Sequence, residues 1–384
     1  MPIDAPEELP PLPLPEGVRQ RFIDGINGLK VHLLEAGHET PGRPMVLLLH
    51  GFPELAYSWR RIMPALAGAG YHVIAPDQRG YGRTWHKPVA YDDDLAPYRL
   101  LNLVRDALGL VRAFGREHID AVIGHDFGSF VAAWAAITRP DVFRSVALMS
   151  APFAGVPKIP FDTAAQGGVS PIADPVHDQL AARSRPRKHY QWYYSTRPAA
   201  AEMDAPPQGL HDFLRAYYHH KSADWQANKP YPLTAWSADE LARLPTYYVM
   251  DLDETMPETE AHEMPTNDEI AANRWLPDEE LAVYAREYAR TGFQASLNWY
   301  RCKTTGRFSG ELELFDGRTI DVPSCFIAGA SDWGIHQTAG AFEKMQAEAL
   351  TDMRGCNLVD GAGHWVQQEQ SEETARLLLA FLDR

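Results

Sequence analysis

Cysteine is scarce in this chain of 384 residues. The three cysteines, Cys302, Cys325 and Cys356, are widely spaced, odd in number and never form a CxxC pair. A small, odd number of scattered cysteines argues against a disulfide framework, and the lack of closely spaced cysteine pairs argues against a cysteine-based zinc site. We therefore expect neither a disulfide framework nor a metal site.

Long basic runs and long apolar runs are also missing. The formal net charge is -15 and the sequence pI ≈ 5.4, so the surface should repel nucleic acid and anionic membranes. No apolar stretch is long enough to cross a bilayer. The first residues, MPIDAPEELPPLPLPEG, are acidic and rich in proline, and they lack the basic and apolar regions of a signal peptide. We expect a cytoplasmic protein with an extended proline-rich arm on its surface.

What the sequence does contain is an alternation of strand-like and helix-like segments. PMVLLLH, residues 44–50, is a continuous apolar run that is typical of a strand buried on both faces. Leu100 to Phe114 instead repeats apolar residues at helical spacing, and Gly115 follows as a natural C-cap. Further expected strands cover residues 18–26, 29–34, 72–77, 119–126 and 142–152, and a further expected helix covers residues 129–140. This alternation predicts an α/β fold with a mostly parallel sheet.

The alternation stops after Pro152 and resumes near residue 322. The intervening segment is rich in aromatic residues, proline, aspartate and glutamate, and its expected helices are irregular. Beyond it we expect a strand over residues 322–332, a helix from about Thr338, a strand near residues 357–359, and a last helix that Ser371 opens with two acidic residues in its first turn. The simplest interpretation is one core in two parts, residues 1–153 and 318–384, with a mainly helical cap, residues 154–317, inserted between them.

An aspartate between two glycines ends the expected strand at residues 119–126. The stretch Gly124-His125-Asp126-Phe127-Gly128 has the form of a nucleophile elbow, a sharp strand-to-helix turn that exposes the residue at its tip. Small residues must flank the tip because the strand and the helix leave no room for side chains there. A lone motif of this kind also fits an incidental loop, so the prediction that Asp126 is a nucleophile depends on its partners.

Three further features supply what a nucleophile at Asp126 needs. The loop at residues 50–54, HGFPE, follows a buried strand, and its Phe52 N–H and the N–H of Phe127 can form an oxyanion hole. His364, in the glycine-rich loop GAGHW, can reach the elbow as a base, and Asp332, at the end of an expected strand, can accept its Nδ1–H. The chain order of nucleophile, acid and histidine is the one that this architecture requires.

Other histidines compete with His364 for the role of base. His50 and His125 lie inside the two loops just described, where packing against the backbone is the expected role. His219 and His220 lie in the expected cap, and His336 follows Asp332.

The motifs in both halves of the core resemble those of a known family. HGFPELAYSWR (residues 50–60), APDQRGYGRT (75–84), GHDFGS (124–129) and GAGHWVQQE (361–369) are similar to signatures of the α/β-hydrolase fold, and in particular of epoxide hydrolases with an aspartate nucleophile. The resemblance implies that no cofactor is needed and that Glu54 helps to position the hydrolytic water. It also implies that DQRGYG, residues 77–82, is a structural turn that locks the core.

The resemblance further implies two cap tyrosines that donate hydrogen bonds to an epoxide oxygen. HYQWYYSTRPAAAEM (residues 189–203) and TGFQASLNWYRC (291–302) are similar to the family segments that carry them, and matching residue by residue gives Tyr190 and Tyr300. Tyr193 and Tyr194 stay open as alternatives for the first. The expected reaction takes a small hydrophobic epoxide and water to a vicinal diol through an alkyl-enzyme ester on Asp126. A homodimer is one arrangement that the sequence leaves open.

Two other functions also stay open. Haloalkane dehalogenases use the same set of aspartate, histidine and aspartate, and Trp299 or Trp365 could bind a halide. Phe127 stands where those enzymes usually have tryptophan, and it departs from many epoxide hydrolases as well. A non-catalytic ligand-binding relative would keep the pocket, but an intact catalytic triad argues against that interpretation because a receptor needs no activated water.

The cap carries a long insertion, residues 222–275, which departs from the family and weakens the inference about substrate. Inside it, YYVMDLDET (247–255) mimics the DxDxT signature of phosphatases with an aspartate nucleophile. That fold needs its own parallel sheet around the motif, for which the insertion leaves no room. We therefore expect Asp251 and Asp253 to lie in an acidic loop of the lid.

Overall fold

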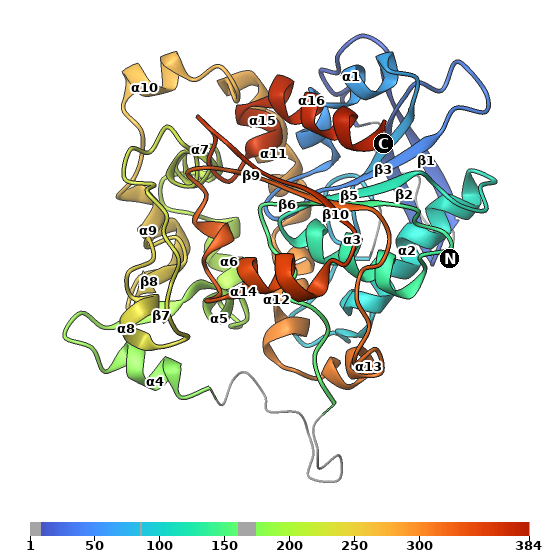
Figure 1. The fold of residues 1–384 in the computed structure, drawn as a ribbon. Coiled ribbons are helices and arrows are strands. Elements are labelled where there is room, and N and C mark those ends of the chain that lie inside the picture. Colours follow the sequence, from blue (N-terminus) through green and yellow to red (C-terminus); the bar gives the residue numbers. More distant parts are fainter. Residues whose placement is uncertain (1–8, 85–86, 160–173, 384) are drawn as a thin grey trace.

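The computed structural model describes residues 9–84, 87–159 and 174–383 of the chain, and its centre is an eight-stranded sheet (Figure 1). The strand order is β1-β2-β4-β3-β5-β6-β9-β10. β2 is antiparallel to both β1 and β4, and every other neighbouring pair is parallel. In chain order the strands are β1 (Val18–Ile26), β2 (Leu29–Ala36), β3 (Met45–Leu49), β4 (His72–Pro76), β5 (Ala121–His125), β6 (Val146–Met149), β9 (Ser324–Gly329) and β10 (Met353–Val359). The predicted α/β fold with a mostly parallel sheet is confirmed.

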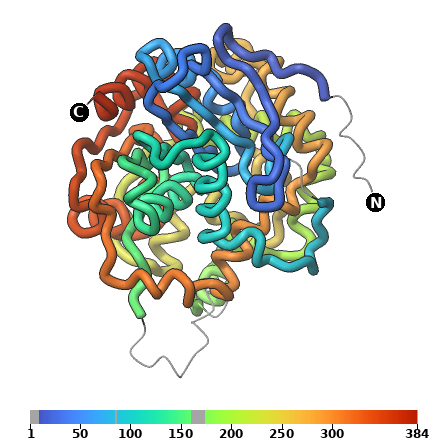
Figure 2. Tube along the Cα trace, turned by 90° about the vertical axis from the view of Figure 1, so that its right-hand side faces the viewer, coloured from blue at the N-terminus to red at the C-terminus, as the bar shows by residue number. Residues whose placement is uncertain are grey.

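Strand β3 shows why the central strands are continuously apolar. All of its residues are buried, and successive side chains point to opposite faces of the sheet. Val46 and Leu48 pack with α1 (Met63–Gly68) and α16 (Ser371–Leu382), whereas Leu47 and Leu49 pack with α2 (Leu100–Ala113) and α3 (Phe127–Thr138). Figure 1 shows α1 and α16 on one side of the sheet and α2 and α3 on the other, and in Figure 2 the yellow helices of the cap lie behind these layers. Helices on both faces leave the central strands β3, β5, β6 and β9 no solvent-exposed face, so an alternating polar pattern is absent from them, whereas the edge strands β1 and β10 expose residues to solvent.

Several element boundaries differ from the expectation. β6 begins at Val146, later than predicted, and β10 begins at Met353, earlier than predicted. The helix expected from Thr338 consists of α14 (Ala341–Lys344) and a π-helical turn, η5 (Met345–Ala349). The last helix, by contrast, begins at Ser371 as predicted, and the backbone carbonyl of Gln370 accepts its first hydrogen bond, from the N–H of Thr374.

The segment between β6 and β9 is mainly helical, as expected for an inserted cap. It contains α4 (Val176–Ala181), β7 (Arg187–His189), α5 (Tyr190–Tyr194), α6 (Ala199–Asp204), α7 (Leu210–His220), α8 (Ala238–Leu241), β8 (Val249–Asp251), α9 (Met256–Ala261), α10 (Asn267–Ala272), α11 (Asp278–Thr291), α12 (Gln294–Thr304) and α13 (Ser309–Glu313). Short helices elsewhere are η1 (Ala56–Trp59), η2 (Ala96–Tyr98), η4 (Trp333–Ile335) and α15 (Val366–Glu369). The division at residues 153 and 318 stays a prediction.

Buried polar contacts connect the cap to the core. The Arg83 Nε donates to Glu287 Oε1 of α11 at 2.8 Å, and the Tyr218 hydroxyl of α7 donates to the carbonyl of Pro53 at 3.2 Å. These contacts fix α7 over the loop that follows β3 and α11 over the turn that follows β4, and therefore place both helices over the carboxyl ends of the parallel strands. Ligands of open α/β sheets bind at this edge.

The DQRGYG stretch forms a tight turn after β4, in agreement with its expected structural role. Asp77 Oδ1 accepts the N–H of Ala56 at 2.8 Å, and its Oδ2 accepts the N–H of Arg83 at 2.8 Å and lies 2.7 Å from His32 Nδ1. One buried carboxylate thus satisfies donors from three separate segments.

The described part of the N-terminal arm lies on the core, and residues 1–8 of the predicted arm lie outside the described residues. The Pro10 carbonyl accepts from Arg83 Nη2 at 2.7 Å, and the Pro13 carbonyl accepts from the Tyr57 hydroxyl at 3.2 Å. Among the described residues, no helix combines the length and apolar character needed to cross a membrane.

The DxDxT-like stretch of the insertion does not form a phosphatase site. Asp251 ends β8, which pairs with β7 in an antiparallel two-stranded sheet. Both of its carboxylate oxygens accept from Arg185, at 2.6 Å each. Asp251 is therefore an ion-pair partner at the edge of the cap, and the parallel sheet that a phosphatase needs around this motif is not found among the described strands.

Candidate active site

Asp126 occupies the sharp turn between β5 and α3, as the elbow motif predicts. Its φ of 52° lies in the left-handed region, which a non-glycine residue rarely adopts. A Cβ atom on Gly124 would lie 2.1 Å from the carbonyl oxygen of Gly128, and one on Gly128 would lie 2.3 Å from the carbonyl oxygen of Leu49. Only glycine fits at either position, so the two glycines are what allow the carboxylate to stand at the tip.

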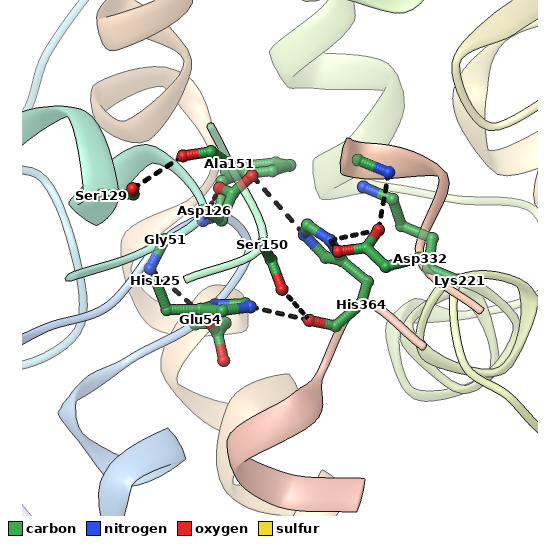
Figure 3. Close-up of polar contacts among 12 residues, drawn as sticks. Gly51, Glu54, His125, Asp126, Ser129, Ser150, Ala151, Lys221, Asp332 and His364 are labelled. Carbon is green, nitrogen blue, oxygen red and sulfur yellow. Dashed lines mark hydrogen bonds and ion pairs between the residues drawn. The ribbon is translucent and has the colours of Figure 1, made fainter. Parts of the chain in front are cut away.

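The structure brings Asp126, His364 and Asp332 together at the carboxyl edge of the sheet (Figure 3). His364 Nε2 lies 3.5 Å from Asp126 Oδ2, and His364 Nδ1 lies 3.1 and 3.2 Å from the two oxygens of Asp332. Within the described chain, no other histidine has a ring nitrogen within ion-pair distance of the Asp126 carboxylate. Asp332 also accepts the N–H of Gly334 at 2.7 Å, which fixes its orientation toward the imidazole.

One half of the predicted oxyanion hole contacts the nucleophile directly. The Phe52 N–H donates to Asp126 Oδ1 at 2.9 Å. Phe127 follows Asp126 as the first residue of α3, and within the described structure its N–H makes no hydrogen bond to that carboxylate. The role of Phe127 therefore stays a prediction.

The charges of the site are strongly coupled. Burial favours the neutral form of Asp126, but the contact with His364 and its charge outweigh burial and hold the pKa of Asp126 well below its usual range. Burial lowers the pKa of His364, yet the charge of Asp332 and the contact with Asp126 raise it to about 9. At neutral pH the free site thus holds a carboxylate nucleophile beside an imidazolium.

A second layer of hydrogen bonds holds the histidine loop in place. His125 Nε2 lies 2.7 Å from the carbonyl oxygen of His364, and Ser150 Oγ donates to the same oxygen at 3.0 Å. The other ring nitrogen of His125, Nδ1, lies 2.5 Å from Glu54 Oε2. His50 Nδ1 lies 2.8 Å from the carbonyl oxygen of Gly51, and its Nε2 accepts the N–H of Gln78, in the turn after β4, at 3.0 Å. Both histidines have the packing role that the sequence predicts.

Glu54 is completely buried and its two oxygens are already occupied. Oε2 accepts the N–H of Gly51 at 3.2 Å and contacts His125, while Oε1 accepts the side-chain amides of Gln367 and Gln368 at 2.7 and 3.3 Å. Burial raises its pKa, but the neighbouring His125 outweighs burial, so the carboxyl is ionised. Glu54 therefore anchors the loops around the triad, and a direct contact of its carboxylate with the hydrolytic water stays a prediction.

The narrow space in front of Asp126, about 30 Å³, is lined by both predicted cap tyrosines. Gln191 Nε2 donates to the Tyr190 hydroxyl at 2.9 Å, and this hydroxyl donates to Gln337 Oε1 at 3.2 Å. The Tyr300 hydroxyl makes no hydrogen bond with any described residue. Burial, followed by the charge of Asp126, raises the pKa of both hydroxyls, so both keep the proton that a donor needs.

The alternatives for the first tyrosine are occupied elsewhere. The Tyr193 hydroxyl donates to Glu202 at 2.7 Å, and the Tyr194 hydroxyl lies 3.1 Å from that of Tyr217. Neither residue lines the space at Asp126, whereas Tyr190 does. The geometry favours Tyr190.

Trp299 and Trp365, the two tryptophans considered as halide ligands, already donate their indole N–H groups to backbone carbonyls. The accepting atoms are the backbone carbonyl oxygen of Arg79, 2.9 Å from Trp299 Nε1, and that of Tyr218, 2.8 Å from Trp365 Nε1. Both side chains are buried, so neither N–H faces a bound halide.

Sequence reasoning missed Lys221, which lies beside Asp332 and His364 in Figure 3. Its side chain is buried, its ammonium lies 4.8 Å from the centre of the Tyr248 ring, and its carbonyl accepts the N–H of His364 at 2.9 Å. Its positive charge lowers the pKa of His364. No motif marks this lysine, because only the packing of α7 against the histidine loop brings it to the site.

Among the described residues, no group of three or more histidine, cysteine, aspartate or glutamate side chains could hold a metal ion.

Comparisons with known proteins agree with this geometry. A family model of the alpha/beta hydrolase fold matches residues 44–370. The chain therefore belongs to the α/β-hydrolase fold family. It is 34% identical over 367 residues to Epoxide hydrolase A of Mycobacterium tuberculosis, covering 94% of this chain and 97% of the relative, and 32% identical over 359 residues to Epoxide hydrolase B of the same organism, covering 92% and 96%. Within the α/β-hydrolases, the chain belongs to the epoxide hydrolases.

Solved structures give the same result over the full length of the fold. An epoxide hydrolase from an endophytic Streptomyces matches with a TM-score of 0.74 at 33% sequence identity, covering 96% of both chains. Epoxide Hydrolase A from Mycobacterium thermoresistibile matches with a TM-score of 0.70 at 32% identity, covering 95% of this chain and 98% of the other. The cap is included in these matches, since they cover nearly the whole chain.

Proposed function

We propose that the protein converts an epoxide and water to a vicinal diol through a covalent ester on Asp126. The observation that carries this proposal is the arrangement around one carboxylate. Asp126 Oδ1 accepts the Phe52 N–H, Oδ2 faces His364 Nε2, and two buried tyrosines line the space in front. A carboxylate so placed attacks a strained carbon, because attack on an ordinary ester would give an unproductive anhydride.

In the first step, a carboxylate oxygen of Asp126 forms a bond to one epoxide carbon, and the carbon–oxygen bond of the ring breaks. The electron pair of that bond moves to the epoxide oxygen, which takes a proton from Tyr190 or Tyr300. The Tyr300 hydroxyl lacks a described partner, so its proton is free to be directed at the substrate. This step leaves a neutral alkyl ester on Asp126 and a tyrosinate. The His364 imidazolium, whose pKa falls once Asp126 is neutral, returns a proton to the tyrosinate through solvent, so that both groups are neutral before the second step.

In the second step, His364 Nε2 takes a proton from water, and the resulting hydroxide attacks the carbonyl carbon of the ester. The Phe52 N–H, and by proposal the Phe127 N–H, stabilise the negative charge on the carbonyl oxygen. The ester bond breaks, the leaving alkoxide takes the proton of the added hydroxyl group and departs as the diol, and the Asp126 carboxylate is restored beside the His364 imidazolium. Asp332 holds the imidazole orientation and stabilises the imidazolium.

The electrostatics give the two steps an order. In the free site the contact with ionised Asp126 helps to raise the pKa of His364 to about 9, so the histidine holds a proton. Esterification removes the charge of Asp126, and with it one cause of the raised pKa. His364 thus gains the ability to act as a base only after the ester has formed.

Neither alternative function gains support from the site. Halide release needs N–H donors, and the two candidate indoles already bind backbone carbonyls. A non-catalytic receptor has no use for an imidazole held between two carboxylates. A cytoplasmic location and a homodimer stay predictions.

The test is intact-protein mass spectrometry of His364→Gln, mixed in turn with styrene oxide and with a short bromoalkane. Without its base the enzyme should stop at the ester and gain the full mass of the epoxide on the peptide that contains Asp126. The double variant Asp126→Ala, His364→Gln is the control and should gain nothing. A gain of the alkyl mass from the bromoalkane alone would replace the proposal with dehalogenation. Absence of any adduct, together with an inert wild type, would refute it.

A further inference from the structure

A second cavity, of about 370 Å³, adjoins the narrow space at Asp126. Phe127, Phe130, Lys303 and Ala341 line both, so the two spaces share one wall. Substrate pockets are typically about 300 Å³ or larger, which the space at Asp126 is not. The adjoining cavity is therefore where most of a substrate has to lie.

The lining of this second cavity is mostly apolar. Its aromatic and aliphatic residues include Tyr98, Trp134, Phe153, Trp299, Phe308 and Leu312. Its one acidic lining residue among the described residues, Glu311, is paired with Arg99 Nε at 3.1 Å. An apolar cavity of about 150 Å³ accepts benzene, so this one has room for an aryl group or a branched alkyl chain.

Lys303 is a cation on the shared wall. Its ammonium lies 5.2 Å from the centre of the Phe130 ring, which also lines both spaces. The Lys303 side chain is exposed, and part of the surface that it exposes faces the two spaces, since it lines both of them. Burial still lowers its pKa. Across the described ranges, no carboxylate forms an ion pair with it, and the nearby charge of Asp126 raises its pKa.

Helical geometry links Lys303 to the position of the reacting ring. Lys303 follows Tyr300 by three residues in α12, so both side chains lie on one face of the helix. An anion bound to Lys303 would lie within a few bonds of an epoxide oxygen that accepts from Tyr300. It would also supply the charge partner that Lys303 lacks among the described residues.

We propose that the substrates are epoxides that carry an apolar substituent and, within a few bonds of the ring, a carboxylate or another anionic group. The apolar substituent occupies the second cavity and the anion binds Lys303. Lys303 then offsets the repulsion between the substrate anion and the Asp126 carboxylate that must approach it. This inference rests on the proposed function, because it assigns a specificity to the same site.

The test compares 3-phenyloxirane-2-carboxylate with its neutral carboxamide, which has the same shape without the charge. Lys303→Met keeps the apolar stem of the side chain and removes the ammonium. We expect the carboxylate-to-amide ratio of kcat/KM to fall by about tenfold or more relative to wild type, as for loss of a hydrogen bond to a charged group. Lys344→Met is the matched control, since Lys344 is an exposed lysine that lines neither space, and it should leave the ratio unchanged.

Charge reversal provides the second arm. Lys303→Glu should shift the preference toward the aminomethyl analogue, 3-phenyloxirane-2-methanamine, which wild type should disfavour. If Lys303→Met lowers kcat/KM equally for the carboxylate and the amide, Lys303 acts on the ring opening itself and the inference is overturned. If wild type hydrolyses the amide with the Asp126-dependent adduct but shows no preference for charge, the inference fails while the proposed function stands. If neither epoxide is consumed while styrene oxide still forms the ester on Asp126 of His364→Gln, the inference fails and the proposed function stands; if styrene oxide forms no ester either, both fail.

Discussion

The timing of the base can be tested by removing one charge. Asp126→Asn imitates the neutral ester, because it replaces the carboxylate beside His364 with an uncharged group of the same shape. In wild type the pKa of His364 is about 9. If the mechanism is right, this pKa must fall when Asp126 loses its charge, whether by alkylation or by substitution.

The structure sets the size of the fall. His364 Nε2 and Asp126 Oδ2 are 3.5 Å apart, and a charge pair at this distance is worth about 5 kcal/mol at an effective dielectric constant of about 20. This corresponds to roughly three pKa units. Asp332 still raises the pKa of His364, while burial and Lys221 lower it. We therefore expect the pKa to fall to about 7 or below, within reach of physiological pH.

The assay is an NMR titration of protein with isotope-labelled histidine. The His364 ring is assigned by the signal that disappears in His364→Gln. Asp126→Ala is a parallel variant that cannot revert by deamidation, and the mass of Asp126→Asn is checked after each titration. A His364 pKa that stays within half a unit of the wild-type value in both variants would contradict the proposed timing.

Four further predictions follow from single contacts. Gly128→Ala should lower the free energy of unfolding in urea by about 3 kcal/mol or more, because its Cβ would lie 2.3 Å from the carbonyl of Leu49; an unchanged midpoint would count against the elbow geometry. Tyr300→Phe should slow ester formation by about 10² to 10⁴ in stopped-flow single turnovers, whereas Tyr193→Phe, whose hydroxyl is bound to Glu202, should stay within about twofold; equal effects would argue against the assignment. Glu54→Gln should slow ester hydrolysis by about tenfold without slowing ester formation, because it loosens the histidine loop; a selective loss of ester formation would be the opposite of this expectation. The pKa of His364 in the folded protein lies above its unfolded value of 6.5, so the stabilisation that its proton provides is complete below about pH 6.5 and is lost as the pH rises through 9. The difference in free energy of unfolding between wild type and His364→Gln should therefore shrink by about 3 kcal/mol between pH 6 and pH 9. A constant difference would contradict the raised pKa.

The elbow and the triad were predictable because their constraints are local or follow from the topology. Gly124 and Gly128 mark the elbow in the sequence, since a Cβ atom at either position would collide with a backbone carbonyl oxygen. The carboxyl ends of parallel strands meet at one edge of the sheet, so Asp332 after β9 and His364 after β10 had to approach Asp126. The continuous apolar runs similarly required a sheet that is covered on both faces.

The partners of Glu54 and the position of Lys221 could not be predicted in the same way. Glu54 is bound by Gln367 and Gln368, more than three hundred residues further along the chain, and no periodicity connects such positions. Lys221 lies beside His364 only because the cap packs on the histidine loop. The sequence indicates which residues have the chemistry for a site, but tertiary packing decides which of their atoms are still free to use it.

Phe127 departs from the pattern of the family that the motifs resemble, and its position in the structure gives a physical reason for the smaller side chain. Tryptophan is usual at this position in the families that the motifs resemble, and this chain has phenylalanine. Its ring lies 5.0 Å from that of Trp299 and 5.4 Å from that of Tyr300, and it lines both the space at Asp126 and the adjoining cavity. The larger indole of a tryptophan would narrow the opening between the two spaces, through which the substituent of a bound epoxide has to pass. The smaller ring at position 127 and the cation at position 303 therefore act on the same boundary, one by leaving room for an apolar group and the other by attracting an anion.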